Sequence, residues 1–242
     1  MPVDRPTSAV PGSRGVRVAV IDSGVYPDHP HVLGVDGGVA ITADGENGDY
    51  VDRIGHGTAV AAAIREKAPE ARLFAVRIFD RTLAGNLNTL LRGVDWAIEQ
   101  GCHVINLSLG TTRMEHEPRL SAAVDRARAA GAVLVAARED GGQRFLPGSL
   151  RGVIGVMVDW DCPRDRVRTE RLESGQVLCR ASGYPREIPG VSPTRNLMGV
   201  SFAVANTTGV IARMLARGMD DGSPDLAAWI DRALIDNPLI PA

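Results

Sequence analysis

The sequence predicts an α/β protein in which a mostly parallel central sheet is flanked by helices. Short apolar runs alternate with longer amphipathic segments along most of the 242 residues, a pattern typical of repeated strand–helix–strand units. The chain is 44% apolar, and this length allows one large core. Because no internal repeat or linker stands out, we predict a flexible N-terminal segment, residues 1–14, followed by a single domain, residues 15–242.

The expected elements follow from this alternation. Strands are predicted where the apolar runs fall: Val16–Ile21, Val39–Thr42, Leu73–Ile78, His103–Leu107, Val133–Ala137 and Val153–Met157. Helices are predicted over the amphipathic stretches between and after them: Gly57–Lys67, Asn86–Gln100, Pro118–Ala130, Ser201–Arg217 and Pro224–Ile235. The segment Asp159–Pro193 is rich in charges, prolines and glycines, and is expected to be irregular or to form short antiparallel strands.

Composition and charge exclude several classes of protein. A formal charge of −2 gives no argument for a nucleic-acid or membrane partner. No apolar run approaches the ~20 residues of a membrane span, and the polar N-terminus lacks the apolar stretch of a signal peptide. The odd number of cysteines favours reduced, packed thiols, although Cys162 and Cys179 could pair. Together these features predict a cytoplasmic protein.

Three segments that lie far apart in the chain each contain a residue that acyl transfer requires. They are Val18–Gly24 with Asp22, Gly55–Thr58 with His56, and Gly199–Ala203 with Ser201. A serine hydroxyl becomes a useful nucleophile when a histidine takes its proton and a carboxylate fixes the tautomer of that histidine. Each segment alone also fits a turn, a packed loop or a helix cap. Their joint occurrence in the order Asp, His, Ser predicts a catalytic triad.

These segments resemble the subtilisin-like serine proteases, and the resemblance extends over roughly residues 15–217. It includes Ala68–Arg77, Gly93–Ile98 and His103–Gly110. It implies a three-layer subtilisin-like fold, with Ser201 as nucleophile, His56 as general base and Asp22 as the group that orients His56. The triad residues would lie at the carboxyl ends of strands and at helix N-termini, where ligands bind in open parallel sheets. Asp52 is not needed in this scheme.

The resemblance also implies where a peptide or protein substrate would bind. An extended peptide would add to a sheet edge at Ser108, Leu109 and Gly110, and Ala136 and Ala137 would also belong to the substrate-binding residues. A glycine at position 110 would let the substrate backbone approach closely. The simpler alternative is a strand that ends in a glycine turn.

The sequence departs from the family at the oxyanion hole. Glu139 stands where the family has a donor asparagine, and an ionised carboxylate cannot donate a hydrogen bond. A protonated Glu139, a donor from Arg138 or Gln143, or a one-residue shift of the loop would restore the function. Arg138 stands where the family has a glycine that borders the pocket for the residue before the scissile bond. Its long cationic side chain would fill this pocket or favour an acidic side chain in it. Alternatively, it would point to solvent and pair with Glu139 or Asp140. Val200 replaces a threonine whose hydroxyl can assist the oxyanion.

The sequence also lacks the family's tight calcium site. The stretch that matches the calcium-binding insertion is only Arg65–Lys67, and His31 replaces an expected aspartate, whereas calcium needs about six to eight oxygen ligands. We therefore predict no metal and no cofactor.

Two functions remain open at this point. The first is a narrow-specificity cytoplasmic endopeptidase that processes peptides and has an atypical oxyanion hole. The second is a catalytically impaired peptide-binding or scaffold protein, suggested by Glu139 and Val200. An esterase is less favoured, and the oligomeric state is not predicted.

Overall fold

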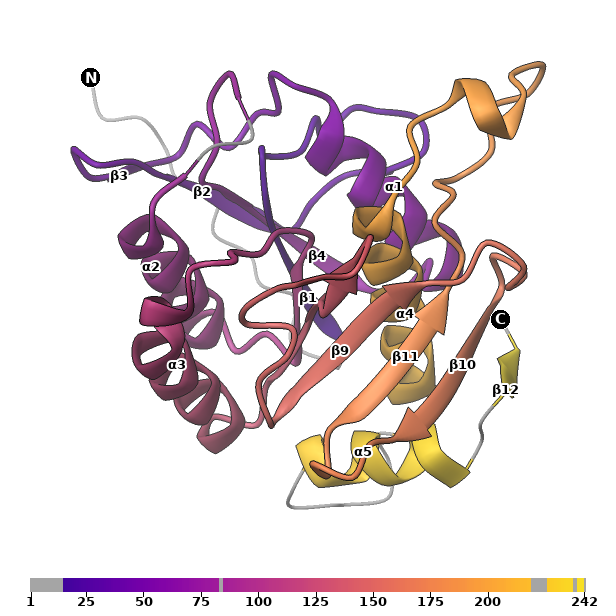
Figure 1. Ribbon diagram of the computed structural model, residues 1–242. Coiled ribbons are helices and arrows are strands. Elements are labelled where there is room, and N and C mark those ends of the chain that lie inside the picture. The colour runs from indigo at the N-terminus through magenta and orange to yellow at the C-terminus, as the bar shows by residue number, and fades with distance from the viewer. Residues whose placement is uncertain (1–14, 83–84, 219–225, 237–238, 242) are drawn as a thin grey trace, which may run out of the picture.

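A mixed sheet forms the middle layer of the protein, seen here in a computed structural model (Figure 1) that describes residues 15–82, 85–218, 226–236 and 239–241. The strand order over the described residues is β12-β10-β11-β9-β6-β5-β1-β4-β2-β3. Its strands are β1 (Arg17–Asp22), β2 (Gly37–Ile41), β3 (Glu46–Asn47), β4 (Arg72–Arg77), β5 (Val104–Leu107), β6 (Val133–Ala137), β9 (Val153–Val158), β10 (Arg166–Arg171), β11 (Val177–Ala181) and β12 (Leu239–Pro241). From β11 across to β2 in this order, neighbouring strands pair parallel. At the two ends of the sheet, β3 pairs antiparallel with β2, and β10 pairs antiparallel with both β11 and β12.

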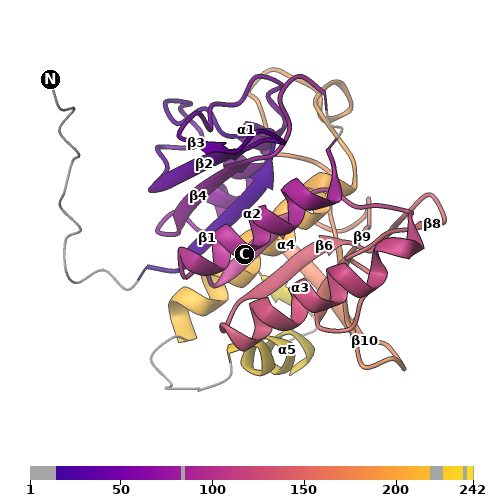
Figure 2. The same ribbon diagram turned by 90° about the vertical axis from the view of Figure 1, so that its left-hand side faces the viewer.

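Helices cover both faces of this sheet. Figure 1 and the rotated view in Figure 2 show α2 and α3 on one face and α1 and α4 on the other. The helices are α1 (His56–Lys67), α2 (Leu87–Glu99), α3 (Glu117–Ala129), α4 (Val200–Gly218) and α5 (Leu226–Asp236), with short 3₁₀ turns at Met114–His116 and Pro193–Arg195. The predicted three-layer α/β class is therefore confirmed.

Strand β1 shows how the sequence produces two cores. Val18 and Val20 belong to the cluster on the α1 and α4 side, whereas Ala19 and Ile21 belong to the cluster on the α2 and α3 side. All four side chains are fully buried, because alternate residues of a strand point to opposite faces and both faces are covered. This explains why the strand reads as a continuous apolar run.

The predicted strands and helices all occur, with ends within two residues of those expected. The segment after residue 158 contains more regular structure than its composition indicates. Strands β10 and β11 pair antiparallel, as expected, but β11 also pairs parallel with β9 and extends the main sheet. Residues 1–14, for which a flexible segment was predicted, lie outside the described residues.

Two further observations concern expectations from composition. Cys102, Cys162 and Cys179 are buried and free, as predicted. Among the described residues, no helix is both long enough and apolar enough to cross a membrane.

Candidate active site

Asp22 and His56 meet at the carboxyl end of β1. Asp22 is the last residue of this strand and is fully buried, and His56 is the first residue of α1. The Nδ1 atom of His56 lies 2.8 Å from Oδ1 and 3.0 Å from Oδ2 of Asp22. The backbone N–H of Ser23 also donates to Asp22 Oδ1, at 2.7 Å. A carboxylate held in this way keeps the Nδ1–H tautomer of His56 and leaves Nε2 free to accept a proton.

Asp52, which the catalytic scheme does not use, organises the turn that leads into α1. It accepts hydrogen bonds from the Ser23 hydroxyl at 2.9 Å, from the Ile54 and Gly55 N–H groups at 2.8 Å each, and from both the N–H and the hydroxyl of Thr58. The Ser23 hydroxyl accepts in turn from the Gly57 N–H. These contacts satisfy N–H groups at the helix start that have no intrahelical partner. They fix the position of the His56 backbone and therefore the direction of its side chain.

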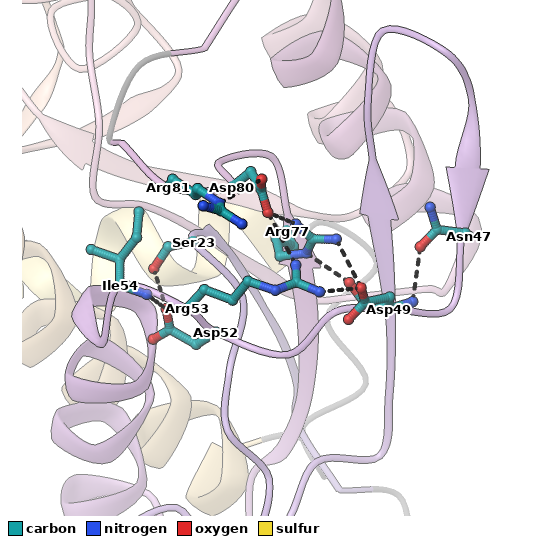
Figure 3. A network of polar contacts seen from close by, with 9 residues as sticks. All are labelled: Ser23, Asn47, Asp49, Asp52, Arg53, Ile54, Arg77, Asp80 and Arg81. Atoms are coloured by element: carbon teal, nitrogen blue, oxygen red, sulfur yellow. Dashed lines mark hydrogen bonds and ion pairs between the residues drawn. The ribbon is translucent and has the colours of Figure 1, made fainter.

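An ion-pair network fastens the preceding loop to the end of β4. Figure 3 shows Arg53 and Arg77 between the carboxylates of Asp49 and Asp80, beside the Ser23–Asp52 contact. Arg53 lies 2.5 Å from Asp49 and 3.1 Å from Asp80, and Arg77 lies 2.9 Å from Asp80. Because Arg53 and both carboxylates are largely exposed, each pair adds little stability. Their joint effect is to hold the loop in one position.

The environment of His56 raises its pKa above the ordinary value of 6.5. Burial alone acts in the opposite direction, since it disfavours the imidazolium. The hydrogen bond and charge of Asp22, together with the charge of Asp52, outweigh burial. The site therefore stabilises the protonated form of His56.

We expect the pH profile of kcat/KM to reflect this raised pKa. A general base must be neutral to accept a proton, so activity should fall as the pH drops through a value above 6.5. Asp52→Asn removes one of the charges that raise the pKa and should move the midpoint to lower pH. Asp125→Asn, on the exposed surface of α3, is the control and should leave it in place. A wild-type midpoint at or below 6.5 would contradict the assignment.

Ser201 lies in the first turn of α4, and the residue after it contacts His56. The ring of the adjacent Phe202 packs against the imidazole with a centroid distance of 5.8 Å. Within the described structure, the Ser201 hydroxyl donates to the carbonyl oxygen of Ser108 at 3.2 Å and makes no hydrogen bond to His56. The Ser108 hydroxyl donates back to the Ser201 carbonyl at 3.1 Å.

A buried amide anchors this pair of serines. Asn106 donates to the Ser108 hydroxyl at 2.9 Å and accepts from Thr208 of α4, also at 2.9 Å. Asn106 and Thr208 are both fully buried, so the chain of hydrogen bonds joins the end of β5 to the helix that carries Ser201. Sequence analysis did not predict this role for Asn106, because its partner Thr208 lies 102 residues away.

The predicted oxyanion residues lie in the loop after β6. Glu139 begins β7 (Glu139–Asp140), which pairs with β8 (Gln143–Arg144) in a short hairpin. In the described part of the chain, the Glu139 carboxylate has no hydrogen-bond partner, and Gln143 donates to the Arg144 carbonyl. Val200 begins α4 and is half-buried.

Arg138 does not point to solvent and pair with nearby carboxylates, which was one of the orientations expected for it. Its guanidinium donates to the side-chain oxygen of Gln176, a residue of the segment between β10 and β11. Gln176 is nearly fully buried, and its amide donates to the carbonyls of Gly148, Leu150 and Val153. Arg138 is thereby held by a buried residue and does not pair with Glu139 or Asp140. Sequence analysis missed Gln176, because its partners lie at least 23 residues away.

The predicted substrate-binding residues follow the paired strands β5 and β6. Ser108, Leu109 and Gly110 continue from β5, while Ala136 and Ala137 end β6 and are buried. A Cβ atom at position 110 would lie 2.9 Å from the Cβ of Phe145, so this glycine permits a close approach between two chain segments. The Phe145 side chain therefore borders the end of the segment.

Arg65 belongs to the short stretch that matches the family's calcium-binding insertion. Its guanidinium donates to the carbonyls of Val32, Gly34, Pro69 and Ala71 at 2.5 to 3.2 Å. These carbonyls thus already face a cation, and a metal ion beside it would be repelled. The residues present do not fit a calcium site.

A sheet with Asp22, His56 and Ser201 gathered at one edge is the arrangement of triad serine hydrolases. The chain belongs to the subtilase family, which it matches over residues 13–158. A thermostable alkaline protease of Halalkalibacterium halodurans is 37% identical over 226 residues, covering 84% of this chain and 57% of that protein. Subtilisin E of Bacillus subtilis is 38% identical over 131 residues, covering 50% of this chain and 33% of that protein. The chain thus spans about half or less of the length of these relatives.

Solved structures show the same fold. The prenylagaramide maturation protease PagA matches with a TM-score of 0.68 and 26% identity, over 90% of this chain and 81% of that chain. A cold-adapted subtilisin-like serine proteinase matches with a TM-score of 0.70 and 23% identity, over 98% of this chain and 87% of that chain.

Proposed function

We propose that this protein is a serine endopeptidase that hydrolyses peptide bonds through an acyl-enzyme. The observation that carries the proposal is the contact of His56 Nδ1 with both oxygens of the buried Asp22, while Phe202, which follows Ser201 in α4, packs against the His56 ring. Burying a carboxylate costs free energy, so a fully buried partner indicates that the orientation of His56 matters for function. The proposal includes the catalytic domain over residues 15–242.

The reaction would begin with a rotation of the Ser201 hydroxyl. It leaves the Ser108 carbonyl and donates instead to Nε2 of His56, which takes the proton as the Oγ–carbon bond forms. His56 then passes the proton to the leaving amine as the carbon–nitrogen bond breaks. Water, activated by the same histidine, hydrolyses the acyl-enzyme and restores Ser201. Asp22 stabilises the imidazolium in both halves of the reaction.

The Ser108 carbonyl, once the Ser201 hydroxyl has left it, would accept a hydrogen bond from the substrate. A peptide that lies along residues 108–110 brings its own N–H groups to this edge, and one of them can replace the Ser201 hydroxyl at the Ser108 oxygen. Substrate binding would then release the nucleophile toward His56. The free enzyme would have a less reactive serine than the complex.

We also propose that the oxyanion hole is atypical. The Ser201 N–H, in the first turn of α4, has no intrahelical partner and can donate to the oxyanion. Arg138 and Gln143 are bound elsewhere, and an ionised Glu139 would repel the oxyanion. Loss of one such donor typically costs about 10²–10³ in kcat. Turnover should therefore be slow for a peptidase.

A slow, selective enzyme suits peptide processing in the cytoplasm. A maturation protease is among the proteins of similar structure, and three free, buried cysteines are compatible with a reducing compartment. An enzyme that degrades proteins would need a higher kcat, and therefore a more effective oxyanion hole, than an enzyme that processes a few peptides.

One observation favours a second function, that of an impaired peptide-binding protein. The Ser201 hydroxyl is bound to Ser108 and Glu139 replaces a donor, so the site could hold a peptide without cleaving it.

Labelling with a fluorophosphonate distinguishes the two functions. We expect the wild-type protein to become labelled at Ser201, because His56 activates this hydroxyl. Ser201→Ala should remove labelling and lower peptide hydrolysis by about 10⁴–10⁶-fold. Ser108→Ala serves as the matched serine variant and should still be labelled, because it keeps the nucleophile and the Ser108 carbonyl and removes only the hydroxyl that donates to the Ser201 carbonyl. A folded wild-type protein that is neither labelled nor active would favour the scaffold.

A further inference from the structure

A cavity of about 540 Å³ lies beside the proposed substrate segment. Leu109, Gly110 and Thr111 form one wall, directly after the Ser108 carbonyl that holds the Ser201 hydroxyl. The floor is apolar and is formed by Ile78, Phe79, Leu87 and Leu90. Of these, Ile78, Phe79 and Leu90 are buried. The cavity is therefore continuous with the surface along which a peptide would extend.

The rim of this cavity is basic. Arg113, His116 and Arg119 line it, and none of the described residues that line it is acidic. Glu115 and Glu117 belong to the same stretch of chain but do not line the cavity. The charge that a ligand in the cavity would meet is thus positive, although the whole chain has a formal charge of −2.

The two arginines have donors available for a ligand. Arg113 is exposed, and the described structure gives its guanidinium no hydrogen bond or ion pair. Arg119 donates through one terminal nitrogen to Asn88 at 2.7 Å, and a guanidinium carries five N–H donors. Guanidinium groups bind carboxylates through charge-assisted and often bidentate hydrogen bonds.

We propose that this cavity selects peptide substrates with an acidic side chain on the acyl side of the scissile bond, with Arg113 and Arg119 as the residues that determine specificity. A strand advances about 3.3 Å per residue, so the acidic residue would lie roughly two to four residues before the cleaved bond. The apolar floor would hold the stem of that side chain or an apolar neighbour. This inference rests on the proposed function, because it assumes that the peptide follows residues 108–110.

The test uses internally quenched peptides with Glu, Gln or Lys placed at each position before the cleaved bond in turn. At the selective position we expect kcat/KM to be about three- to tenfold higher for Glu than for Gln, the range for partly exposed ion pairs and charge-assisted hydrogen bonds. The advantage should shrink at high salt. Arg113→Gln and Arg119→Gln should each reduce it, and Arg113→Glu should favour the Lys peptide. Arg151→Gln, in the exposed turn before β9, is the matched control and should leave it intact.

The same peptides, tested for binding to Ser201→Ala, separate this inference from the proposed function. Preferential binding of Glu peptides without cleavage by the wild-type protein would support the acidic preference and overturn the peptidase. Cleavage or binding that is equal for Glu and Gln would overturn the acidic preference and leave the peptidase intact. A preference for Lys, or no binding of any peptide, would also overturn it. Because Arg113 and Arg119 are exposed, circular dichroism should show these variants folded.

Discussion

Replacing Asp22 with Asn should lower kcat/KM by about 10⁴-fold while leaving the fold intact. An amide at this position is nearly the same size as the carboxylate, so the buried end of β1 should keep its packing. However, the amide NH₂ group cannot accept a hydrogen bond from Nδ1–H of His56, whereas the two carboxylate oxygens lie 2.8 and 3.0 Å from Nδ1 and can accept it. The histidine would take the wrong tautomer, and the imidazolium formed during attack would lose its counter-charge.

The matched measurement compares three proteins at several pH values. Asp125→Asn, an exposed carboxylate on α3, should retain wild-type activity. The acid limb of Asp22→Asn should also move toward lower pH, because the charge and hydrogen bond of Asp22 both raise the pKa of His56. Activity of Asp22→Asn within tenfold of wild type would show that His56 does not depend on this carboxylate.

Local sequence was sufficient to predict the fold and the triad segments. Val18–Ile21 is a continuous apolar run because both faces of β1 are buried, and parallel strands align their carboxyl ends at one edge. Asp22 and His56 therefore fall at predictable places in the fold. The family resemblance added the roles of these residues and the position of the substrate segment.

Residues that act through distant partners could not be predicted in this way. Asp52 looked like an ordinary loop carboxylate, yet it receives hydrogen bonds from Ser23, 29 positions earlier, and from Thr58. Gln176 appears within a polar turn, yet it binds Arg138 and three carbonyls of another segment. In both cases the partner depends on how the chain returns in space, which no local pattern encodes.

These distant contacts also change the view of the electrophilic half of the site. Sequence alone allowed Arg138 to replace the missing oxyanion donor, but its contact with the buried Gln176 holds it away from that task. In the proposed mechanism, stabilisation of the oxyanion would then come mainly from the N–H groups at the start of α4. We therefore expect slow chemistry, with selectivity supplied by binding along residues 108–111.

Replacing Arg65 with Met should lower the free energy of unfolding by about 3–5 kcal/mol. The Arg65 guanidinium joins the loop after β1 to the loop before β4 through Val32, Gly34, Pro69 and Ala71. Its removal leaves buried carbonyls without a donor, and each such group costs about 1–3 kcal/mol. Methionine carries no charge, so the variant avoids the cost of burying the guanidinium, and this offsets part of the loss. Burial disfavours the charged form of Arg65 and lowers its pKa.

Chemical denaturation of the full chain measures this effect. Arg65→Lys keeps the positive charge but replaces a planar fork with one compact donor group, so we expect a loss between those of the wild type and Arg65→Met. Arg151→Met removes an exposed guanidinium of the same size and should change stability by about 0.5 kcal/mol or less. If Arg65→Met were no less stable than Arg151→Met, the two loops would be held by their own packing. That result would show that the hydrogen bonds of Arg65 do not stabilise the fold.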